Sequence, residues 1–155
     1  MSFLDFIKNW RGQLLSLQGI NDGHLPQILA FGRMPEGELY QVEEPPFGLA
    51  LRRYTDQHGP LSVTDSVTLI ATIARVVNYA HGEGIAHGGL SPETIYIEER
   101  RVGDFEVFIT DWEMGELVIA LHHANEPLND RFKRYLSPEQ RGGSTVPPPT
   151  PAGDV

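Results

Sequence analysis

Two spacings of hydrophobic residues alternate along this chain of 155 residues, and each predicts a different element. Residues 3–17 carry one apolar stripe at helical spacing, which predicts an amphipathic helix packed against the rest of the domain. Residues 25–32 and 38–43 are short runs on either side of a turn that contains Pro and Gly, which predicts two strands. Residues 49–57 predict a short helix, because a His-Gly-Pro stop signal follows them.

A longer helix is predicted over residues 62–81, ending at Gly82. Ser62 has the character of an N-cap, and Asp65 supplies a carboxylate three residues later. The apolar positions of this segment cover nearly the whole helix circumference, a pattern typical of a helix that is buried on most sides. We therefore expect its apolar face to be covered, if not by this chain then by another protein subunit.

The C-terminal part of the sequence predicts a hairpin followed by irregular structure. Residues 94–99 and 105–110 are two β-rich runs joined by a turn, which predicts a β-hairpin. Residues 115–134 show no clear periodicity and are expected to be irregular. Residues 142–155 are rich in Gly and Pro, which predicts an extended tail or linker. This organisation implies one domain over residues 1–141 and a tail over residues 142–155.

Charge and composition exclude several classes of function. The formal net charge of −9 argues against a nucleic-acid backbone as partner, because such binding needs clustered Lys and Arg. The absence of cysteine excludes disulfides and thiolate metal sites. His122, His123 and Glu126 form no matching set of metal ligands, because adjacent His side chains do not share a helix face. The sequence shows neither a signal peptide nor an apolar run that spans a bilayer, so a cytoplasmic protein is expected.

Three short motifs carry the chemistry of the chain. Residues 85–97 read IAHGGLSPETIYI, residues 107–113 read VFITDWE, and residues 135–140 read YLSPEQ. The first resembles the catalytic loop of eukaryotic-type protein kinases, whose pattern is His-Arg-Asp-Leu-x-x-x-Asn followed by an apolar strand. The second resembles the strand that leads into the family's metal-binding Asp-Phe-Gly, and the third resembles its Ala-Pro-Glu element. Three motifs in the family's order are a specific signal of a kinase-like domain, similar to the Ser/Thr protein kinases of bacterial type.

This resemblance implies an α+β, protein-kinase-like fold that is partial. The helix at residues 3–17 and the two strands after it would belong to the small lobe, and the helix at residues 62–81, the catalytic-loop hairpin and the activation segment to the large lobe. On this alignment the chain ends at Asp154 and Val155, where the family's central helix starts. The first three strands, with the Gly-rich loop and the ATP-binding Lys, are expected to be missing. The Glu of the family's regulatory helix falls near Arg11, so its ion pair with that Lys is also expected to be absent.

The positions that transfer the phosphoryl group in the family hold other residues here. The resemblance places Gly89 where the family has the Asp that accepts the proton of the substrate hydroxyl. Ser91 takes the position of the loop Lys that steadies the phosphoryl group, and Thr94 takes that of the metal-binding Asn. Loss of a general base alone typically lowers a rate by about 10²–10⁴. His87, at the first position of the motif, is expected to be a buried structural histidine.

Asp111 is retained, and on this resemblance it would bind one Mg²⁺ ion if Mg-ATP binds at all. The Gly of the Asp-Phe-Gly motif is Glu113, whose carboxylate would repel phosphates. Glu43, Glu44 and Pro46 lie in the segment that resembles the family's adenine-binding hinge. Glu43 would be a carboxylate facing an apolar pocket, which is costly unless it is paired, and Pro46 has no backbone N–H to offer to adenine. No nucleotide is expected to bind at this hinge.

These substitutions predict a catalytically inactive kinase-like module, a pseudokinase, that needs no cofactor and acts as a scaffold, a protein-binding or structural subunit of a larger assembly. Its expected partner is a protein subunit that covers the apolar face of the helix at residues 62–81. The alternative is a fragment of a Ser/Thr phosphotransferase, or a nucleotide-binding sensor, that retains Asp111 and takes Mg-ATP as its ligand. Neither interpretation includes a nucleic-acid partner or a membrane span.

Overall fold

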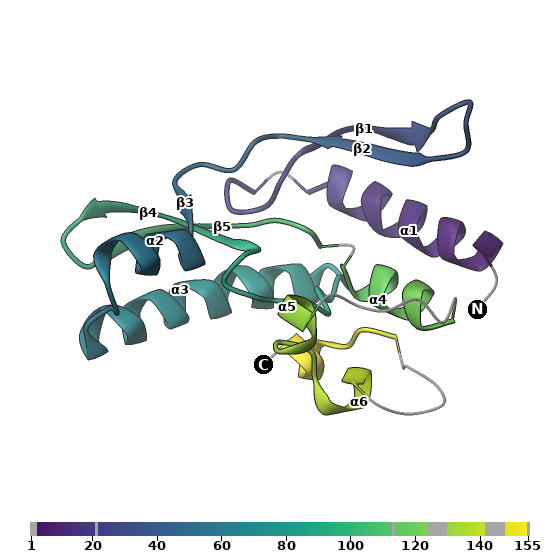
Figure 1. Ribbon diagram of the computed structural model, residues 1–155. Coiled ribbons are helices and arrows are strands. Elements are labelled where there is room, and N and C mark those ends of the chain that lie inside the picture. The colour runs from purple at the N-terminus through teal and green to yellow at the C-terminus, as the bar shows by residue number, and fades with distance from the viewer. Residues whose placement is uncertain (1–2, 21, 113, 124–129, 142–147, 155) are drawn as a thin grey trace.

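The N-terminal part of the structure is a helix that lies along a two-stranded antiparallel sheet (Figure 1). The computed structural model describes residues 3–20, 22–112, 114–123, 130–141 and 148–154, and the structural statements below concern these residues. The helix and both strands confirm the sequence prediction, although the first strand begins three residues later than expected; they are α1 (Phe3–Gln18), β1 (Ile28–Arg33) and β2 (Leu39–Glu43).

The inner face of α1 carries the apolar stripe that the sequence predicted. Trp10, Leu14 and Leu17 are buried, whereas Arg11 is exposed. The Trp10 ring meets the ring of Phe31 on β1 edge-on, with the centroids 5.8 Å apart. Burial of these large side chains, rather than helix propensity, fixes α1 on the sheet, because isolated helices of this length are marginal in water.

A three-stranded antiparallel sheet and a long helix form the second part of the molecule. The strand order is β3-β4-β5, and Ile97 on β4 pairs with Val107 on β5, which confirms the predicted hairpin. The long helix packs across β5, and the short helix lies beside β3 and β4. The elements are β3 (Leu49–Ala50), α2 (Leu51–His58), α3 (Val63–Gly82), β4 (Ile95–Arg101) and β5 (Asp104–Ile109).

The start of α3 is capped as predicted, because the Ser62 hydroxyl accepts the backbone N–H of Asp65 at 3.1 Å. Its burial differs from the expectation of a helix covered on most sides. The side that packs on the sheet is buried, whereas Val63, Val67 and Ile70 are 82%, 64% and 64% exposed. One face of α3 packs against this chain's sheet, and these three apolar residues on another side of the helix are largely exposed.

A helix occupies the stretch that was expected to be irregular. α4 (Met114–His123) follows directly after the second motif, and His122 and His123 form its last two residues, whereas Glu126 lies outside the described residues. The helix forms because of tertiary packing and not because of a regular spacing of hydrophobic residues. Val118 and Ile119 are buried together with Leu136. α4 lies beside α1, and Asn9 donates a hydrogen bond to Glu116 at 3.4 Å.

The C-terminal residues return to the loop that carries the first motif. Two short helices, α5 (Asp130–Lys133) and α6 (Pro138–Arg141), precede residues 148–154, which we call the C-terminal segment. This segment ends in the 3-10 helix η1 (Pro151–Asp154). Residues 142–147 of the predicted tail lie outside the described residues, and a domain boundary after residue 141 stays a prediction.

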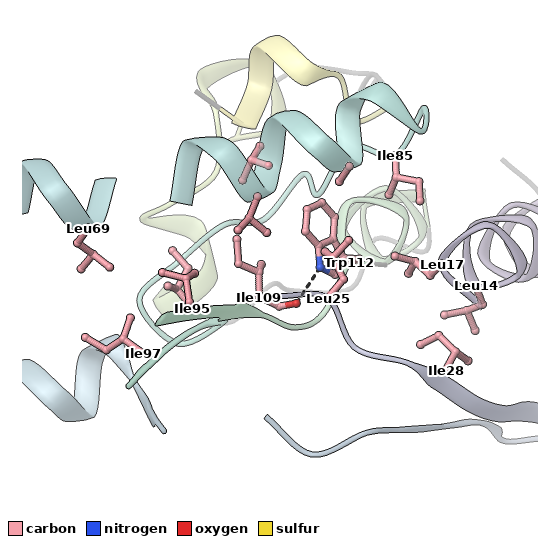
Figure 2. Packing of buried hydrophobic residues seen from close by; sticks show 14 of the residues in the cluster. Leu14, Leu17, Leu25, Ile28, Leu69, Ile85, Ile95, Ile97, Ile109 and Trp112 are labelled. Carbon is pink, nitrogen blue, oxygen red and sulfur yellow. Dashed lines mark hydrogen bonds between the residues drawn. The ribbon is translucent and has the colours of Figure 1, made fainter. Parts of the chain in front are cut away.

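One apolar core joins the two parts of the molecule. Figure 2 shows Trp112 near its centre, between α3 and the strand that carries Ile109, and the Trp112 indole donates a hydrogen bond to the Ile109 carbonyl at 2.8 Å. Leu14 and Leu17 of α1 extend the same core towards the first sheet. The fold is therefore α+β, as expected. Within the described ranges, no helix is long and apolar enough to cross a membrane.

Candidate kinase-like site

His87 anchors the loop between α3 and β4. Its ring is fully buried and lies against Trp112, with the ring centroids 5.0 Å apart. Nε2 donates to the Thr110 carbonyl at 2.8 Å, and Nδ1 accepts the backbone N–H of Gly89 at 3.2 Å. These two bonds require a neutral imidazole. Burial, which disfavours the charged form, lowers the pKa of His87 below its ordinary value, although the bond to Thr110 opposes this shift.

Asp154 fixes the backbone of the same loop from the C-terminal segment. Its fully buried carboxylate accepts the N–H groups of His87 and Gly88 at 2.7 and 2.6 Å. The Nε2 atom of His81, at the end of α3, lies 2.9 Å from the same carboxylate. One side chain thus links η1, the loop and α3, and the two backbone donors satisfy its lone pairs in place of water.

Gly89, which the resemblance places at the family's catalytic-base position, is enclosed by α4. Gly89 is buried, and a Cβ atom at this position would lie 2.9 Å from the Cβ of Met114, the first residue of α4. Met114 is itself buried, so it cannot swing into solvent. A side chain at residue 89 would therefore have to displace the start of α4.

The hydroxyl groups of Ser91 and Thr94 are used within the loop. The Thr94 hydroxyl donates to the Ser91 carbonyl and accepts the Ser91 N–H, both at 3.1 Å. The Ser91 hydroxyl accepts the N–H of Glu93 at 3.3 Å. Both side chains are buried. These bonds close a turn that leads into β4, and they orient both hydroxyls towards the backbone.

Asp111 lies two residues after the end of β5 and has an unusual backbone conformation. Its φ angle is +60°, a region that residues other than Gly enter rarely. Its half-buried carboxylate accepts the Thr110 hydroxyl at 3.3 Å, and its carbonyl accepts the N–H of Met114 at 3.0 Å. Glu113 lies outside the described residues. In the part of the chain that the structure covers, no three His, Asp or Glu side chains gather closely enough to hold a metal ion.

The hinge residues lie where β2 leaves the first sheet. Glu43 is half-buried, and its carboxylate accepts a hydrogen bond from the Gln41 amide at 3.3 Å, so the cost expected for an unpaired buried carboxylate does not arise. Glu44 is exposed, and its N–H donates to the Gln27 carbonyl at 2.9 Å. Pro46 is half-buried.

Sequence reasoning missed two glutamines that hold this site together. Gln13 on α1 donates to the carbonyls of Ala86 and Trp112, which ties α1 to the loop. Gln140 on α6 donates to the Gly88 carbonyl at 2.9 Å. The predicted regulatory-helix position, Arg11, faces solvent instead. A polar residue next to the apolar stripe of a helix was the only signal for Gln13, and many surface glutamines share it.

The chain is similar in sequence to known serine/threonine protein kinases. No protein-family model matches the chain. The serine/threonine-protein kinase pkn3 of Myxococcus xanthus is 26% identical over 131 residues, which cover 82% of this chain and 24% of that protein. The probable serine/threonine-protein kinase PknB of Lactococcus lactis is 29% identical over 111 residues, which cover 72% of this chain and 17% of the relative. The chain thus spans a quarter or less of the length of these curated relatives.

A solved structure gives the same result for the fold. The crystal structure of "Rad53 1-466 in complex with AMP-PNP" superposes with a TM-score of 0.55 at 25% sequence identity, over 68% of this chain and 28% of that chain. The catalytic-loop, Asp-Phe-Gly and Ala-Pro-Glu resemblances of the sequence thus agree with curated relatives and with a three-dimensional match. The chain has a protein-kinase-like fold over the matched region, and its sequence is similar to part of the bacterial serine/threonine protein kinases.

Proposed function

We propose that this kinase-like domain does not transfer phosphoryl groups and that it works as a protein-binding or structural module of a larger assembly. The observation that carries the proposal is the closed position of the general base. Gly89 has no side chain, and Met114 leaves no room for one without a shift of α4. Because phosphoryl transfer depends on positioning and charge neutralisation, a loop that cannot hold the base at this position loses a central catalytic group.

The remaining polar groups of the loop do not replace the missing ones. Ser91 stands where the family has a cation, and its hydroxyl already accepts a backbone N–H. Thr94 stands where the family has a metal ligand, and its hydroxyl oxygen already accepts the Ser91 N–H while its proton goes to the Ser91 carbonyl. Mg²⁺ prefers carboxylate, phosphate and water oxygens in octahedral geometry. The single carboxylate of Asp111 would supply only part of the ligands that such a site needs.

The residues present do not fit Mg-ATP, the group that the fold family implies. At the hinge, Pro46 lacks the N–H that would donate to adenine, and Glu43 and Glu44 bring negative charge to the same stretch. Thr94 is occupied within its own loop, as described above. We therefore propose that the domain works without a nucleotide and without a metal.

A titration of thermal stability with Mg-ATP tests this proposal. A ligand that binds the folded state at ten times its Kd stabilises it by about 1.4 kcal/mol, which raises the Tm of a domain of this size by roughly 3–6 °C. We expect no saturable shift and no phosphate transfer to the chain itself or to a generic substrate. A saturable shift that disappears in Asp111→Ala would refute the proposal, and the exposed-site variant Asp56→Ala is the matched control.

A nucleotide sensor without catalysis is a second candidate, and the geometry of Asp111 favours it. The carboxylate is half-buried rather than closed off, and its positive φ angle is a strained state of the kind that functional sites hold. In this case the titration would show saturable stabilisation that depends on Asp111, whereas phosphate transfer would stay absent. The two measurements together separate sensor, enzyme and inactive module.

The protein-binding half of the proposal is supported by the open face of α3. Val63, Val67 and Ile70 lie on one side of the helix and expose most of their surface. Contiguous exposed apolar patches usually mark an interaction site. A nucleic-acid partner is not proposed, because the net charge of −9 opposes it. A cytoplasmic location is part of the same proposal, and cell fractionation would test it.

A further inference from the structure

The chain contains three hydroxyl residues that directly precede proline: Ser91-Pro92, Ser137-Pro138 and Thr150-Pro151. Ser91 is buried, and its hydroxyl accepts the N–H of Glu93. Ser137 is half-buried, and its hydroxyl donates to the Gln140 side chain at 3.2 Å. Thr150 is exposed, and its hydroxyl makes no hydrogen bond to any described residue. The fold therefore separates three similar dipeptides and presents one of them at the surface.

The residues on either side of Thr150 favour an extended backbone. Pro149 and Pro151 flank it, and a residue that precedes proline is restricted to extended backbone angles. Residues 148–150 belong to no helix or strand. Phosphoryl transfer requires the acceptor hydroxyl to reach the γ-phosphate in the cleft of another protein, so the hydroxyl has to project from the surface of the substrate. Thr150 meets this requirement in the folded chain.

The surroundings of Thr150 disfavour an added negative charge. Thr150 and Glu139 line one cavity of about 30 Å³ that has neither Lys nor Arg among its lining residues. Arg141, on the same short helix as Glu139, already donates to two backbone carbonyls. The Thr150 carbonyl accepts the N–H of Gly153 at 2.9 Å, in the turn that carries the fully buried carboxylate of Asp154. A phosphate on Thr150 adds about 1.5–2 negative charges at pH 7 and would be repelled by these carboxylates.

The C-terminal segment is attached to the loop around His87 on both sides of Thr150. Asp154 accepts the N–H groups of His87 and Gly88. The Pro149 ring fits against two glycines, because an added Cβ at Gly88 or at Gly115 would lie 2.7 Å from this ring. A repulsive group on Thr150 therefore acts between the two contacts that hold the segment in place.

We propose that Thr150 is a phosphorylation site for a protein kinase that recognises proline after the acceptor, and that a phosphate there loosens the C-terminal segment from the loop around His87. In this reaction the Thr150 oxygen attacks the γ-phosphorus of the ATP bound to that kinase. The bond from the γ-phosphorus to the bridging oxygen breaks, ADP leaves, and the hydroxyl proton passes to a base of the kinase. The chain is the substrate in this step, so the inference does not depend on whether the chain binds Mg-ATP itself.

Incubation of the full chain with Mg-ATP and a purified cyclin-dependent kinase, which phosphorylates Ser and Thr before Pro, tests the site. Mass spectrometry of the intact chain and of its peptides should find one phosphate, on Thr150. Thr150→Ala should abolish the modification, and Pro151→Ala should slow it at least tenfold. Thr64→Ala is the matched control, because Thr64 is an exposed threonine that does not precede proline. A reaction without the added kinase shows separately whether the chain phosphorylates itself, which bears on the proposed function alone.

Hydrogen exchange tests the consequence of the phosphate. The backbone amides of His87 and Gly88 donate to Asp154, so their exchange reports whether the C-terminal segment is attached. In the phosphorylated chain both amides should exchange at least tenfold faster than in the unmodified chain. Thr150→Ala, treated with the kinase in the same way, should show unchanged exchange at these amides. Amides in the middle of α3 should not change in either sample, which distinguishes local release from global unfolding.

Three outcomes would overturn the inference. The first is a chain without phosphate on Thr150 after this treatment. A free peptide of residues 146–153 that reacts under the same conditions would then show that the fold closes the site. The second is equal modification of Ser91 or Ser137, because burial would then not select among the three dipeptides. The third is full phosphorylation of Thr150 with unchanged exchange at His87 and Gly88, which would contradict the proposed release of the segment.

Discussion

The loop around His87 and the open face of α3 differ in how many of their groups find partners within this chain. In the loop, the buried side chains find partners, and no buried side-chain polar atom of the described residues lacks a hydrogen bond. His87, Thr94 and Asp154 each bond to backbone groups. On α3, by contrast, Val63 and Val67 expose most of their apolar surface. The kinase-like loop is thus complete as a structural element, and the apolar face is the incomplete one.

This difference indicates where the chain can still gain free energy. A closed, hydrogen-bonded loop gains little from a ligand, because its donors and acceptors are already used. An exposed apolar face gains about 25 cal/mol for each Å² that a partner covers, before the entropic cost of association. The comparison therefore favours binding through the exposed face of α3 over chemistry at the loop.

The largest effect on stability is expected from a methyl group added to the loop around His87. Gly88 has a φ angle of +70°, and a Cβ atom there would lie 2.7 Å from the Cα of Gly115 and from Pro149. Gly88→Ala should therefore lower the free energy of unfolding by about 2–5 kcal/mol, from backbone strain and overpacking together. Urea denaturation measures this change.

The matched control for that substitution lies on α1. Gly12 is a helical glycine, and apart from its own helix backbone no atom lies within 4 Å of an added Cβ. Gly12→Ala should leave the chain equally stable or more stable by up to about 1 kcal/mol, because Ala is the better helix former. If both variants lost the same stability, the loop would not be the tightly packed region that the comparison requires.

A smaller effect on stability is expected from a change of pH, and it arises from His87 in the same loop. Burial holds the pKa of His87 below its ordinary value, so at acid pH the unfolded chain binds a proton that the folded chain excludes. The stability from the neutral histidine is present above the unfolded-state pKa of about 6.5 and is lost as the pH falls below it. The slope is at most about 1.4 kcal/mol per pH unit.

Denaturation at several pH values between 5 and 8 measures this slope in wild type and in His87→Gln. The wild type should lose more stability between pH 6.5 and 5 than the variant, because the Gln side chain takes up no proton. His58→Gln, which changes an exposed histidine, is the matched control. Equal slopes for wild type and His87→Gln would show that this buried ring does not contribute to acid sensitivity.

The smallest effect on stability is expected on the open face. Ile70→Gln should change the free energy of unfolding by no more than about 0.5 kcal/mol, because the side chain is already largely in water. Leu69→Ala, one residue away on the buried side, should cost about 2–5 kcal/mol. Ile70→Gln should also reduce binding of a hydrophobic dye. A large loss of stability in Ile70→Gln would mean that this face is already packed in the isolated chain.

Local signals in the sequence determined several elements correctly. The cap formed by Ser62 and Asp65, the hairpin of β4 and β5, and the stripe of α1 depend on residues that are close in the chain, so their spacing was sufficient. The kinase-like motifs were readable for the same reason, because each is a short run of adjacent residues. The assignment of Gly89, Ser91 and Thr94 to the family's catalytic positions stays a prediction from these motifs.

Other features of the molecule depend on the tertiary structure, because the spacing of residues along the chain does not encode them. α4 forms in a stretch without clear periodicity, because Val118 and Ile119 pack with Leu136 from a distant turn. The closed site at Gly89 depends on Met114, and the fixed loop depends on Asp154, which lies more than 60 residues away in the sequence. The open side of α3 is likewise a property of the folded chain, since an apolar helix is exposed only where no other segment reaches it. Contacts between distant residues create these features, because burial and hydrogen bonding act on neighbours in space.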